Sequence, residues 1–473
     1  MQKAVKERKD RRFRILLLTN RDSDNVGDQI IEASDIGLIS AVMKNLNVDS
    51  DEYEISSRAA AIVTQDYLAK RSPELLDPAR QAIQNCDVVI FGGAPVFNYL
   101  YQNFYERTAV TLEIAEEYKK PVIFSAVGVE QYGEKNAKCQ RLKKTLNFDC
   151  VKQITTRDDF SLLQKYIDKE DIVVKKVADP AVFSAQIFDK YRSVQKNSSK
   201  KKIGLFVLRA NGFVDNKIDF SRYEAAEFWK KLSNELDDRG YDYELLTSGH
   251  FGDEAYLDFL IRNYGVDAKK CVFNMNTPEN LIKKISSYDA VVTCRLHPSI
   301  ISFSLDVPSI GIVWNSKVRN FYKNIGYEDR LVEINQGINV DEVIDKIENA
   351  ISSGVKKNES FLLSVYTTLF NSLKDILCPG SDELVPYTYS ELLRNIPPYK
   401  GTSDKEKAEK LRRKFRRAYK TYNGLFDKNR AGAEQIKQLK EENKQLKEQI
   451  RELQQKSALY SVAKKVSQVL KRK

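Results

Sequence analysis

Histidine is scarce in this sequence of 473 residues, which contains only His250 and His297. The six cysteines are scattered without a Cys-x-x-Cys pair, which is typical of neither a zinc site nor a disulfide framework. We therefore expect no metal centre and no cofactor, and a reducing compartment. Because histidine is the side chain that carries a proton most readily near neutral pH, both histidines need individual attention.

Long apolar runs are also missing. No stretch of about 18 apolar residues occurs, so we expect no membrane span. Residues 1–12 are charged and expected to be disordered. The apolar stretch at 15–18 that follows them is too short for a secretory signal peptide. Together with the scattered cysteines, this predicts a cytoplasmic protein.

Most of the chain lacks a net positive charge. Residues 401–473 contain 22 Lys and Arg against 9 Asp and Glu, a net charge of +13 within a whole-chain total of +11. Residues 1–400 therefore carry a net charge of −2. A nearly neutral body has no basic groove for nucleic acid, and we expect it to bind none. The basic tail favours contact with an anionic surface, such as the inner face of the cell membrane.

Apolar, β-branched runs alternate with helical stretches over most of the sequence, and polar or glycine residues follow each run. This alternation predicts parallel, doubly wound α/β domains. A Ser- and Lys-rich stretch at 191–202 separates two of them, at 13–190 and 203–340. Residues 341–400 show only helical patterns and are expected to pack back on the body. The expected strands include 13–19, 87–91, 121–129, 151–156, 203–209, 243–247, 289–293 and 309–314.

Two successive strand patterns carry the strongest functional signal. The first ends at Arg295 and His297, and the second ends at Lys317. Open parallel sheets bind ligands at the carboxyl ends of their strands. Three cationic side chains at one such edge suit a ligand that has both a phosphate and a carboxylate. The structural alternative is that Arg295 and His297 form a helix cap or a surface pair.

Two loops of the first domain are further candidates for binding. The loop with Asn25, Gly27 and Asp28 follows a strand and precedes a helix, an arrangement that presents backbone N–H groups to an anion. A tight turn with Asp28 as the helix N-cap is the alternative. Gly92 and Gly93 follow another strand, and they allow close approach by a ligand or by a helix.

Residues 401–473 differ in kind from the rest. Apolar residues recur at helical spacing from Leu411 to Leu425 among basic ones, and a heptad pattern follows them. Isoleucine at a, leucine at d and one buried Asn favour a parallel two-stranded coiled coil and a homodimer. The basic, amphipathic end at 461–473 indicates a membrane anchor or a frayed helix end. The a and d positions are Ile436, Leu439, Asn443, Leu446, Ile450, Leu453, Ser457 and Tyr460.

An ordered set of short motifs resembles the polysaccharide pyruvyl transferase family over roughly residues 13–326. No motif is specific by itself, and their order and spacing carry the resemblance. One departure is Ala94, where the family often has a third glycine. The motifs are Asn25-Val26-Gly27-Asp28, Phe91-Gly92-Gly93, Val127-Gly128-Val129, Thr156-Arg157-Asp158, Asp179-Pro180, Arg295-Leu296-His297, and Pro308 followed by Lys317.

The resemblance implies two Rossmann-like domains of the glycosyltransferase-B type. It also implies transfer of a pyruvyl group from phosphoenolpyruvate to sugar hydroxyls of a cell-surface polysaccharide or its lipid-linked precursor, forming a ketal. Arg157, Arg295, His297 and Lys317 would hold the phosphate and carboxylate. With His297 and Arg295 as the catalytic pair, the histidine is either the general acid or a phosphate ligand.

Two other functions are compatible with the same sequence. A nucleotide-sugar-dependent glycosyltransferase would use the same two-domain plan, because one fold hosts many chemistries. A catalytically inactive scaffold that dimerises through its tail would bind no small ligand. The cationic set at the strand ends argues against the scaffold.

Overall fold

The computed structural model describes residues 12–99, 103–193, 199–209, 211–273, 275–334 and 337–470, with the side chains of 466, 469 and 470 left out. The predicted disordered N-terminus, apart from Arg12, lies outside the described residues. So do the last three residues of the predicted membrane anchor. The chain forms two compact units, Met1–Lys410 and Leu411–Lys473.

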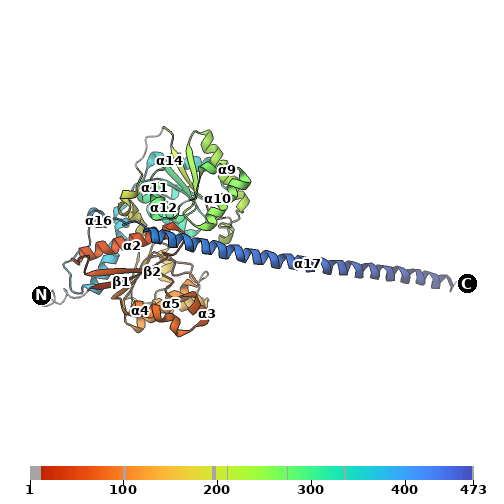
Figure 1. Cartoon of the computed structure of the whole chain (residues 1–473), viewed down its shortest axis with the longest axis horizontal. Coiled ribbons are helices and arrows are strands. Elements are labelled where there is room, and N and C mark those ends of the chain that lie inside the picture. Colours follow the sequence, from red (N-terminus) through yellow and green to blue (C-terminus); the bar gives the residue numbers. More distant parts are fainter. Residues whose placement is uncertain are drawn as a thin grey trace. The chain divides into compact units, whose positions relative to one another are not determined.

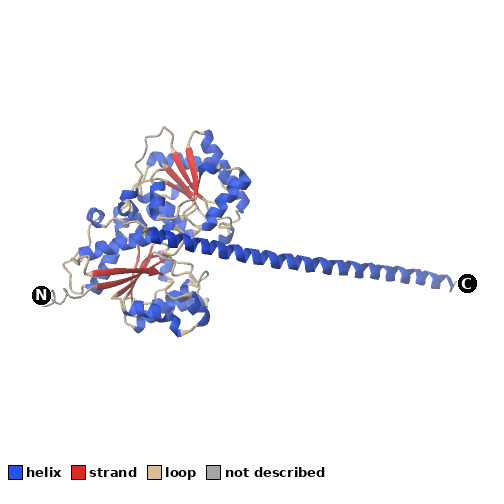
Figure 2. Ribbon diagram, in the orientation of Figure 1, coloured by secondary structure: helices blue, strands red, loops and turns tan. Residues whose placement is uncertain are grey.

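A six-stranded parallel sheet forms the centre of the first domain (Figures 1 and 2). Its strand order is β2-β1-β3-β4-β5-β6. The two central strands, β3 and β4, are fully buried, as expected for runs of Val, Ile and Phe covered on both faces. The strands are β1 (Phe13–Thr19), β2 (Tyr53–Ala59), β3 (Val88–Gly92), β4 (Val122–Val127), β5 (Val151–Thr156) and β6 (Val173–Lys176).

Helix α2 (Val26–Asn45) is the central helix of the body. Its residues are buried around most of its circumference, because the first sheet lies on one side and later helices cover the others. A helix enclosed in this way needs no polar face. The other helices of this domain are α3 (Gln65–Lys70), α4 (Asp77–Gln84), α5 (Phe104–Glu117), α6 (Ala137–Leu146), α7 (Phe160–Gln164) and α8 (Ser184–Ile187), with 3₁₀ turns η1 (Pro73–Leu76), η2 (Pro180–Phe183) and η3 (Asp189–Tyr191).

The second domain contains another six-stranded parallel sheet, in the order β12-β11-β10-β7-β8-β9. Its strands are β7 (Lys202–Phe206), β8 (Asp242–Leu246), β9 (Cys271–Val272), β10 (Ala290–Thr293), β11 (Ser309–Ile312) and β12 (Leu331–Val332). Its helices are α9 (Arg222–Asp238), α10 (Phe251–Tyr264), α11 (Pro278–Ile285), α12 (Leu296–Ser304), α13 (Ser316–Ile325) and α14 (Val340–Ser353), with 3₁₀ turns η4 (Val214–Asn216), η5 (Ala268–Lys270) and η6 (Glu328–Arg330).

Both sheets are doubly wound, and the winding direction reverses between β1 and β3 in the first and between β7 and β10 in the second. Ligands of such sheets bind beyond the carboxyl ends of the strands at these reversal points. Helix α2 follows β1 at the first reversal point and α12 follows β10 at the second. The predicted fold class, two Rossmann-like domains with a helical extension, is confirmed.

The helical segment after the second sheet divides between the two domains. Helix α14 packs on β10 and β11 of the second sheet. Helices α15 (Glu359–Leu377) and α16 (Tyr389–Asn395) lie against α2 instead, and α15 also contacts β4 and β5. The structure therefore places the crossing back to the first domain after α14, later than the predicted boundary at 340.

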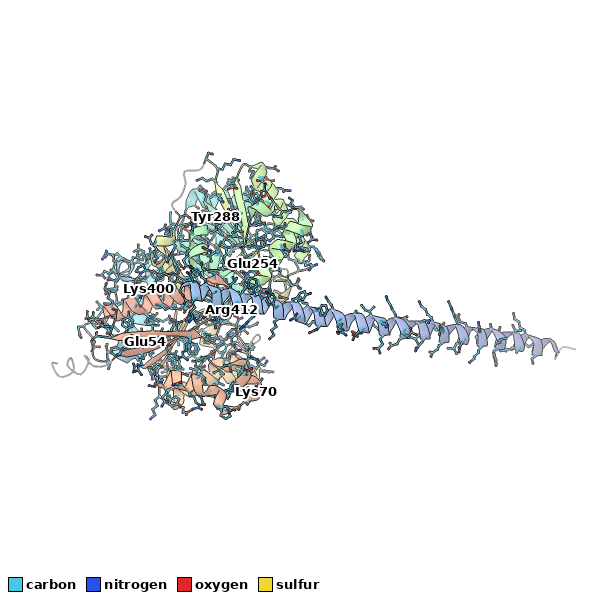
Figure 3. The ribbon with its side chains drawn as sticks, in the orientation of Figure 1. Glu54, Lys70, Glu254, Tyr288, Lys400 and Arg412 are labelled. Carbon is cyan, nitrogen blue, oxygen red and sulfur yellow. The ribbon has the colours of Figure 1, made fainter. Side chains whose placement is uncertain are left out.

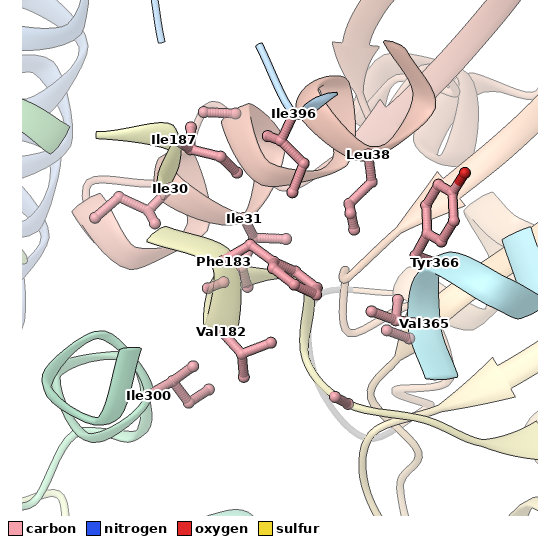
Figure 4. Close-up of a cluster of buried hydrophobic side chains, with 14 of the residues drawn as sticks. Ile30, Ile31, Leu38, Val182, Phe183, Ile187, Ile300, Val365, Tyr366 and Ile396 are labelled. Atoms are coloured by element: carbon pink, nitrogen blue, oxygen red, sulfur yellow. The ribbon is translucent and has the colours of Figure 1, made fainter. Parts of the chain in front are cut away.

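One apolar core extends across both domains. Figure 4 shows its centre, where Ile31 of α2 and Phe183 of η2 lie near Ile300 of α12 and Tyr366 of α15. These side chains come from both domains and from the returning helices, and all are nearly inaccessible to solvent. Since the core is shared, the two domains form one compact unit.

The last helix, α17, spans Asp404–Leu470. Its start belongs to the body, because the Lys410 ammonium donates to the Gln29 side chain at 2.8 Å. Just before the helix, the backbone N–H of Thr402 donates to Glu279. The body thus ends at Lys410 and not at the predicted Gly401. No helix among the described residues is long and apolar enough to cross a membrane.

Candidate functional site

The N-termini of α2 and α12 meet at the domain interface. The backbone N–H of Val26, the first residue of α2, donates to the carbonyl of Ser248 in the second domain at 2.8 Å. One residue earlier, the Asn25 side chain lies 2.9 Å from the Nδ1 atom of His297 in α12. The site is therefore composite, with groups from both domains in direct contact.

The Asn25 contact determines which nitrogen of His297 carries the proton. The amide oxygen of Asn25 caps α2 by accepting from the backbone N–H of Gly27, at 3.4 Å. Its NH₂ group is consequently the part that faces His297, so Nδ1 accepts. In the neutral imidazole the proton then resides on Nε2. That nitrogen is buried without a hydrogen-bond partner, and the nearest Asp28 oxygen is 3.9 Å away.

Gly27 permits this contact because it has no side chain. A Cβ atom at position 27 would lie 2.2 Å from the Cβ of His297, well inside van der Waals contact. The first turn of α2 can approach the imidazole only if this residue is glycine. Gly27 is thus needed for the packing of α2 against His297, and its predicted contact with substrate stays a prediction.

The pKa values of Asp28 and His297 are shifted in opposite directions. Burial, supported by the positive charges of Arg157, Arg295 and Lys317, holds the pKa of His297 well below its usual range. Burial raises the pKa of Asp28 to about 6, against the lowering effects of Ser23, Arg157, Asn20 and Arg295. Near neutral pH the histidine is therefore neutral, and Asp28 is the group of this pair that titrates.

Arg295 is held rigidly at the carboxyl end of β10. Its Nε donates to one carboxylate oxygen of Asp253 at 2.8 Å and its NH₂ group donates to the other at 2.5 Å. The guanidinium also lies 5.7 Å from the centre of the Trp314 ring. Because Asp253 is fully buried, this forked pair fixes the orientation of Arg295 and leaves its remaining N–H groups for another ligand.

The other two cations are also paired with carboxylates. Arg157 forms a buried ion pair with Asp179, although its Nε has no hydrogen-bond partner. The Lys317 ammonium donates to Glu130 at 2.8 Å, and both side chains of this pair are partly exposed. Each of the three cations thus has a carboxylate of the body beside it, and the charges of all three lower the pKa of His297.

A small void and a large cleft meet at Lys317. The void is lined by Arg157, Asp158 and Asp179 as well as Lys317, and its volume of about 20 Å³ admits little more than one water. The cleft, of about 1070 Å³, lies between the two domains and is lined by Lys317, Glu130, Trp314 and other polar residues. Lys317 is the lining residue common to both.

The model of the polysaccharide pyruvyl transferase family matches residues 6–316, well over half of the chain. The chain belongs to this family. It is therefore a transferase of polysaccharide biosynthesis, and the family resemblance carried by the sequence motifs is confirmed. The comparison with curated proteins found no match.

Solved structures show how far the fold of this pyruvyl transferase family member is shared. A UDP-N-acetylglucosamine 2-epimerase matches with a TM-score of 0.50 and 10% identity over 80% of this chain and 99% of that chain. The UDP-GlcNAc 2-epimerase from Methanocaldococcus jannaschii has a TM-score of 0.47 and 14% identity, over 76% of this chain and 98% of that chain. At such identities the likeness concerns the glycosyltransferase-B-like fold alone.

Gly92 and Gly93 allow a helix to approach the carboxyl end of β3 closely. A Cβ at Gly92 would lie 2.2 Å from a carboxylate oxygen of Asp35, and one at Gly93 would lie 2.3 Å from Ile31. Both Asp35 and Ile31 belong to α2, so this helix occupies the space that the glycines leave. Of the two predicted alternatives, the structure shows the close approach of a helix, and the substrate contact of Gly92 and Gly93 stays a prediction.

Two capping roles are also resolved. The N-cap of α2 is Asn25 and not Asp28, whose carboxylate instead accepts from the Asn20 side chain at 3.2 Å. His250 caps α10, because its Nδ1 accepts from the backbone N–H of Gly252 at 3.1 Å. The predicted capping role of His250 is confirmed, and His297 stays the candidate histidine of the site.

Sequence reasoning did not identify the acidic partners Asp253 and Glu130 or the aromatic residue Trp314. Asp253 and Trp314 each follow a strand of the second sheet, as Arg295 does, so their position at a carboxyl end was the available signal. Glu130 likewise follows β4 of the first sheet. The described residues contain no group of three or more His, Cys, Asp or Glu that could hold a metal ion.

Proposed function

We propose that this family member transfers a pyruvyl group from phosphoenolpyruvate to two hydroxyls of a sugar in a cell-surface polysaccharide or its lipid-linked precursor. The observation that carries the proposal is the unpartnered Nε2 of His297, which is buried among Arg157, Arg295 and Lys317. A neutral N–H donor under the influence of three positive charges suits a small ligand with two anionic groups.

The start of α12 is the proposed seat of the phosphate. No side chain caps this helix, and its N-cap residue is Arg295 itself. A helix N-terminus attracts anions through its exposed N–H groups and its dipole. Arg295 and the Nε2–H of His297 would add two charged or polar contacts to the same anion, while Lys317 would reach its carboxylate.

Binding requires the Lys317–Glu130 pair to separate, because the void beside Arg157 is much smaller than phosphoenolpyruvate. Both members of the pair are about one-quarter exposed, so breaking it costs little in water. An incoming carboxylate would replace Glu130 as the partner of Lys317. The ion pair therefore selects for an anionic ligand at the inner end of the cleft.

Asp28 is the proposed source of the proton. Ketal formation needs a proton at the methylene carbon of phosphoenolpyruvate, attack of one hydroxyl oxygen on the adjacent carbon, and departure of phosphate with the C–O bond electrons. Attack of the second hydroxyl completes the ketal. Of the two hydroxyl protons, one returns to Asp28 and the other leaves with phosphate. With a pKa of about 6, Asp28 can both give and regain a proton near neutral pH.

The interdomain cleft is the proposed acceptor site. Its volume of about 1070 Å³ far exceeds that of phosphoenolpyruvate, and it leads directly to Lys317. Trp314 lines it and offers an aromatic surface together with a buried, unpartnered ring N–H. A flat ring beside hydrogen-bonding groups is suited to a sugar.

Thermal denaturation of the full chain with phosphoenolpyruvate, and separately with nucleotide sugars, tests the donor. We expect phosphoenolpyruvate to raise the melting temperature, and the variant Lys317→Met to lose most of this shift. Glu130→Gln frees Lys317 and should lower the phosphoenolpyruvate concentration that gives a half-maximal shift by about two- to fivefold, because a partly exposed ion pair contributes at most about 1 kcal/mol. A shift produced only by nucleotide sugars would overturn the proposal in favour of glycosyl transfer.

The basic tail supports a related proposal, peripheral attachment to the inner face of the cell membrane. Residues 401–473 carry a net charge of +13, which favours an anionic surface. The full chain should sediment together with vesicles that contain anionic lipid at low salt, and it should stay in the supernatant at high salt. Equal retention by neutral vesicles would contradict an electrostatic attachment.

A further inference from the structure

We propose that α17 pairs with α17 of a second copy of this chain, as a parallel, in-register, two-stranded coiled coil from Leu411 to Tyr460. The a and d residues of this stretch are called the seam below. The inference is independent of the reaction that the body catalyses.

The seam is longer than the heptad pattern that starts at Ile436. Counting backward by sevens from Ile436 places Asn429, Tyr422 and Phe415 at a. Counting backward from Leu439 places Gly432, Leu425, Ala418 and Leu411 at d, so the frame continues but its apolar side chains are interrupted at Asn429 and Gly432. The aromatic segment and the Leu/Ile segment therefore share one frame. All of this frame lies within a single continuous helix.

The seam is exposed in the single chain. Leu446, Ile450 and Leu453 are 56%, 52% and 65% accessible to solvent. Figure 3 shows the side chains of α17 projecting from its ribbon along the length of the helix. Apolar side chains repeated at this exposure on one helix stripe indicate a surface that another chain covers.

The period of the seam identifies the kind of partner. A straight α-helix drifts by about 20° per heptad from a strict seven-residue repeat, so seven repeats would rotate the stripe by about 140°. A helix lying on a flat protein surface would lose contact over that rotation. Two helices that supercoil around each other keep a seven-residue seam in contact throughout. The seven-residue repeat from Leu411 to Tyr460 therefore predicts that the partner surface is another α-helix.

Charges beside the seam favour a second copy in parallel orientation. In a parallel pair, Glu442 at g faces Lys447 at e of the other helix, and the symmetric contact occurs as well. In an antiparallel pair the e positions face each other, which would bring Lys440 and Lys447 of the two copies together. Asn443 at a faces its own copy only when the helices are parallel and in register.

The mass of the full chain in solution tests the seam. We expect twice the 54.3 kDa of one chain at micromolar concentration. Leu446→Asp places a carboxylate at a d position in both helices and should raise the dimer dissociation constant at least about a hundredfold. Gln445→Asp adds the same charge one residue away on the outer face and should leave the mass unchanged. A trimer, or a dimer insensitive to Leu446→Asp, would overturn the proposal.

Charge reversal tests the orientation. Glu442→Lys and Lys447→Glu should each weaken the dimer by roughly tenfold, because each brings like charges together in a parallel pair. The double variant restores opposite charges and should recover wild-type affinity. In an antiparallel pair Glu442→Lys would only exchange one like-charge contact for another, so an unchanged affinity for this variant would reject the parallel orientation.

Cross-linking tests the register. In a chain with Cys271→Ser, which removes the one cysteine that is not buried, Asn443→Cys and Ile450→Cys are made separately. Each a residue lies opposite its own copy in a parallel, in-register coil, within disulfide distance. Both variants should form disulfide-linked dimers under mild oxidation. Cross-linking of only one of them, or of neither, would contradict the proposed register.

Discussion

Helices α2 and α12 begin at equivalent places in the two domains, each at the reversal point of its sheet, yet their N-termini differ in one respect. The N-terminus of α2 is satisfied by the chain itself, through the Asn25 cap and the carbonyl of Ser248. The N-terminus of α12 has no side-chain cap and is surrounded by cations.

The difference shows that a strand–loop–helix pattern alone does not define an anion site. Both loops contain small or polar residues, and both would present N–H groups to a ligand if they were left open. In α2 these groups instead fix the domain interface and position Asn25 against His297. Only the α12 terminus retains the capacity for a phosphate, and α2 contributes side chains to it.

Removing the imidazole at the α12 terminus should have the largest effect. We expect His297→Ala to lower kcat/KM for phosphoenolpyruvate by about 10³-fold, because the proposed hydrogen-bond donor to the phosphate is lost. His250→Asn is the matched control, since Asn also caps helices and His250 caps α10. Phosphate release in the presence of acceptor measures both. Comparable losses of kcat/KM in the two variants would contradict a direct role of His297 in the reaction.

Asp28→Asn should reduce activity by about 10²-fold and change its pH dependence. In the wild type, kcat/KM should fall tenfold per pH unit above pH 6, because the carboxyl has a pKa of about 6 and must be protonated. The variant should lack this descending limb. A limb that survives in Asp28→Asn would assign the titration to another group.

The same substitution has a consequence for stability. Since the pKa of Asp28 is raised in the folded state, the native protein loses stability as pH increases from about 4 to 6, where the buried carboxyl becomes charged. Asp28→Asn removes this loss. The variant should therefore gain stability relative to the wild type as the pH rises. The difference in free energy of unfolding, variant minus wild type, should be about 1 kcal/mol larger at pH 8 than at pH 5. Urea titration at both pH values measures the difference.

Gly27→Ala should force the two helix termini apart. Its Cβ would lie 2.2 Å from His297, so we expect a loss of about 1–3 kcal/mol in stability together with reduced activity. Gly37→Ala on the same helix is the control, because its Cβ would meet only side-chain carbons, at 3.3 Å. That variant should stay within about 1 kcal/mol of the wild type. Equal effects of the two would show that helix packing in general, and not the contact with His297, is disturbed.

Asn25→Ser should separate the two functions of the α2 cap and give the smallest effect. Serine caps helices about as well as Asn, so stability should change by less than about 0.5 kcal/mol. It lacks the NH₂ group that faces Nδ1 of His297, and kcat/KM should decrease about tenfold as the imidazole loses its fixed tautomer. Asn25→Ala should add the cost of the lost cap. Full activity of the serine variant would make Asn25 purely structural.

Sequence reasoning found the sheets because interior strands are continuous apolar runs. It missed β2 (Tyr53–Ala59), an edge strand that carries Glu54 and Arg58 and is only partly buried. Charged residues protect such edges and erase the apolar signal. The cations at strand ends were predicted, since parallel strands deliver them to one edge. Their carboxylate partners could not be paired with them, because Asp253 lies in the first turn of α10 and Glu130 in a loop after β4, and their approach to the cations depends on the three-dimensional packing.

The apolar core common to both sheets limits how this protein can move. A hinge motion that bared only 200 Å² of that core would cost about 5 kcal/mol, so fewer than about one molecule in a thousand would be open at any instant. Turnover in this protein should therefore proceed with its halves at a constant separation. Small substrates should enter and leave when side chains at the inner end of the cleft rotate. This rotation is far faster than hinge opening.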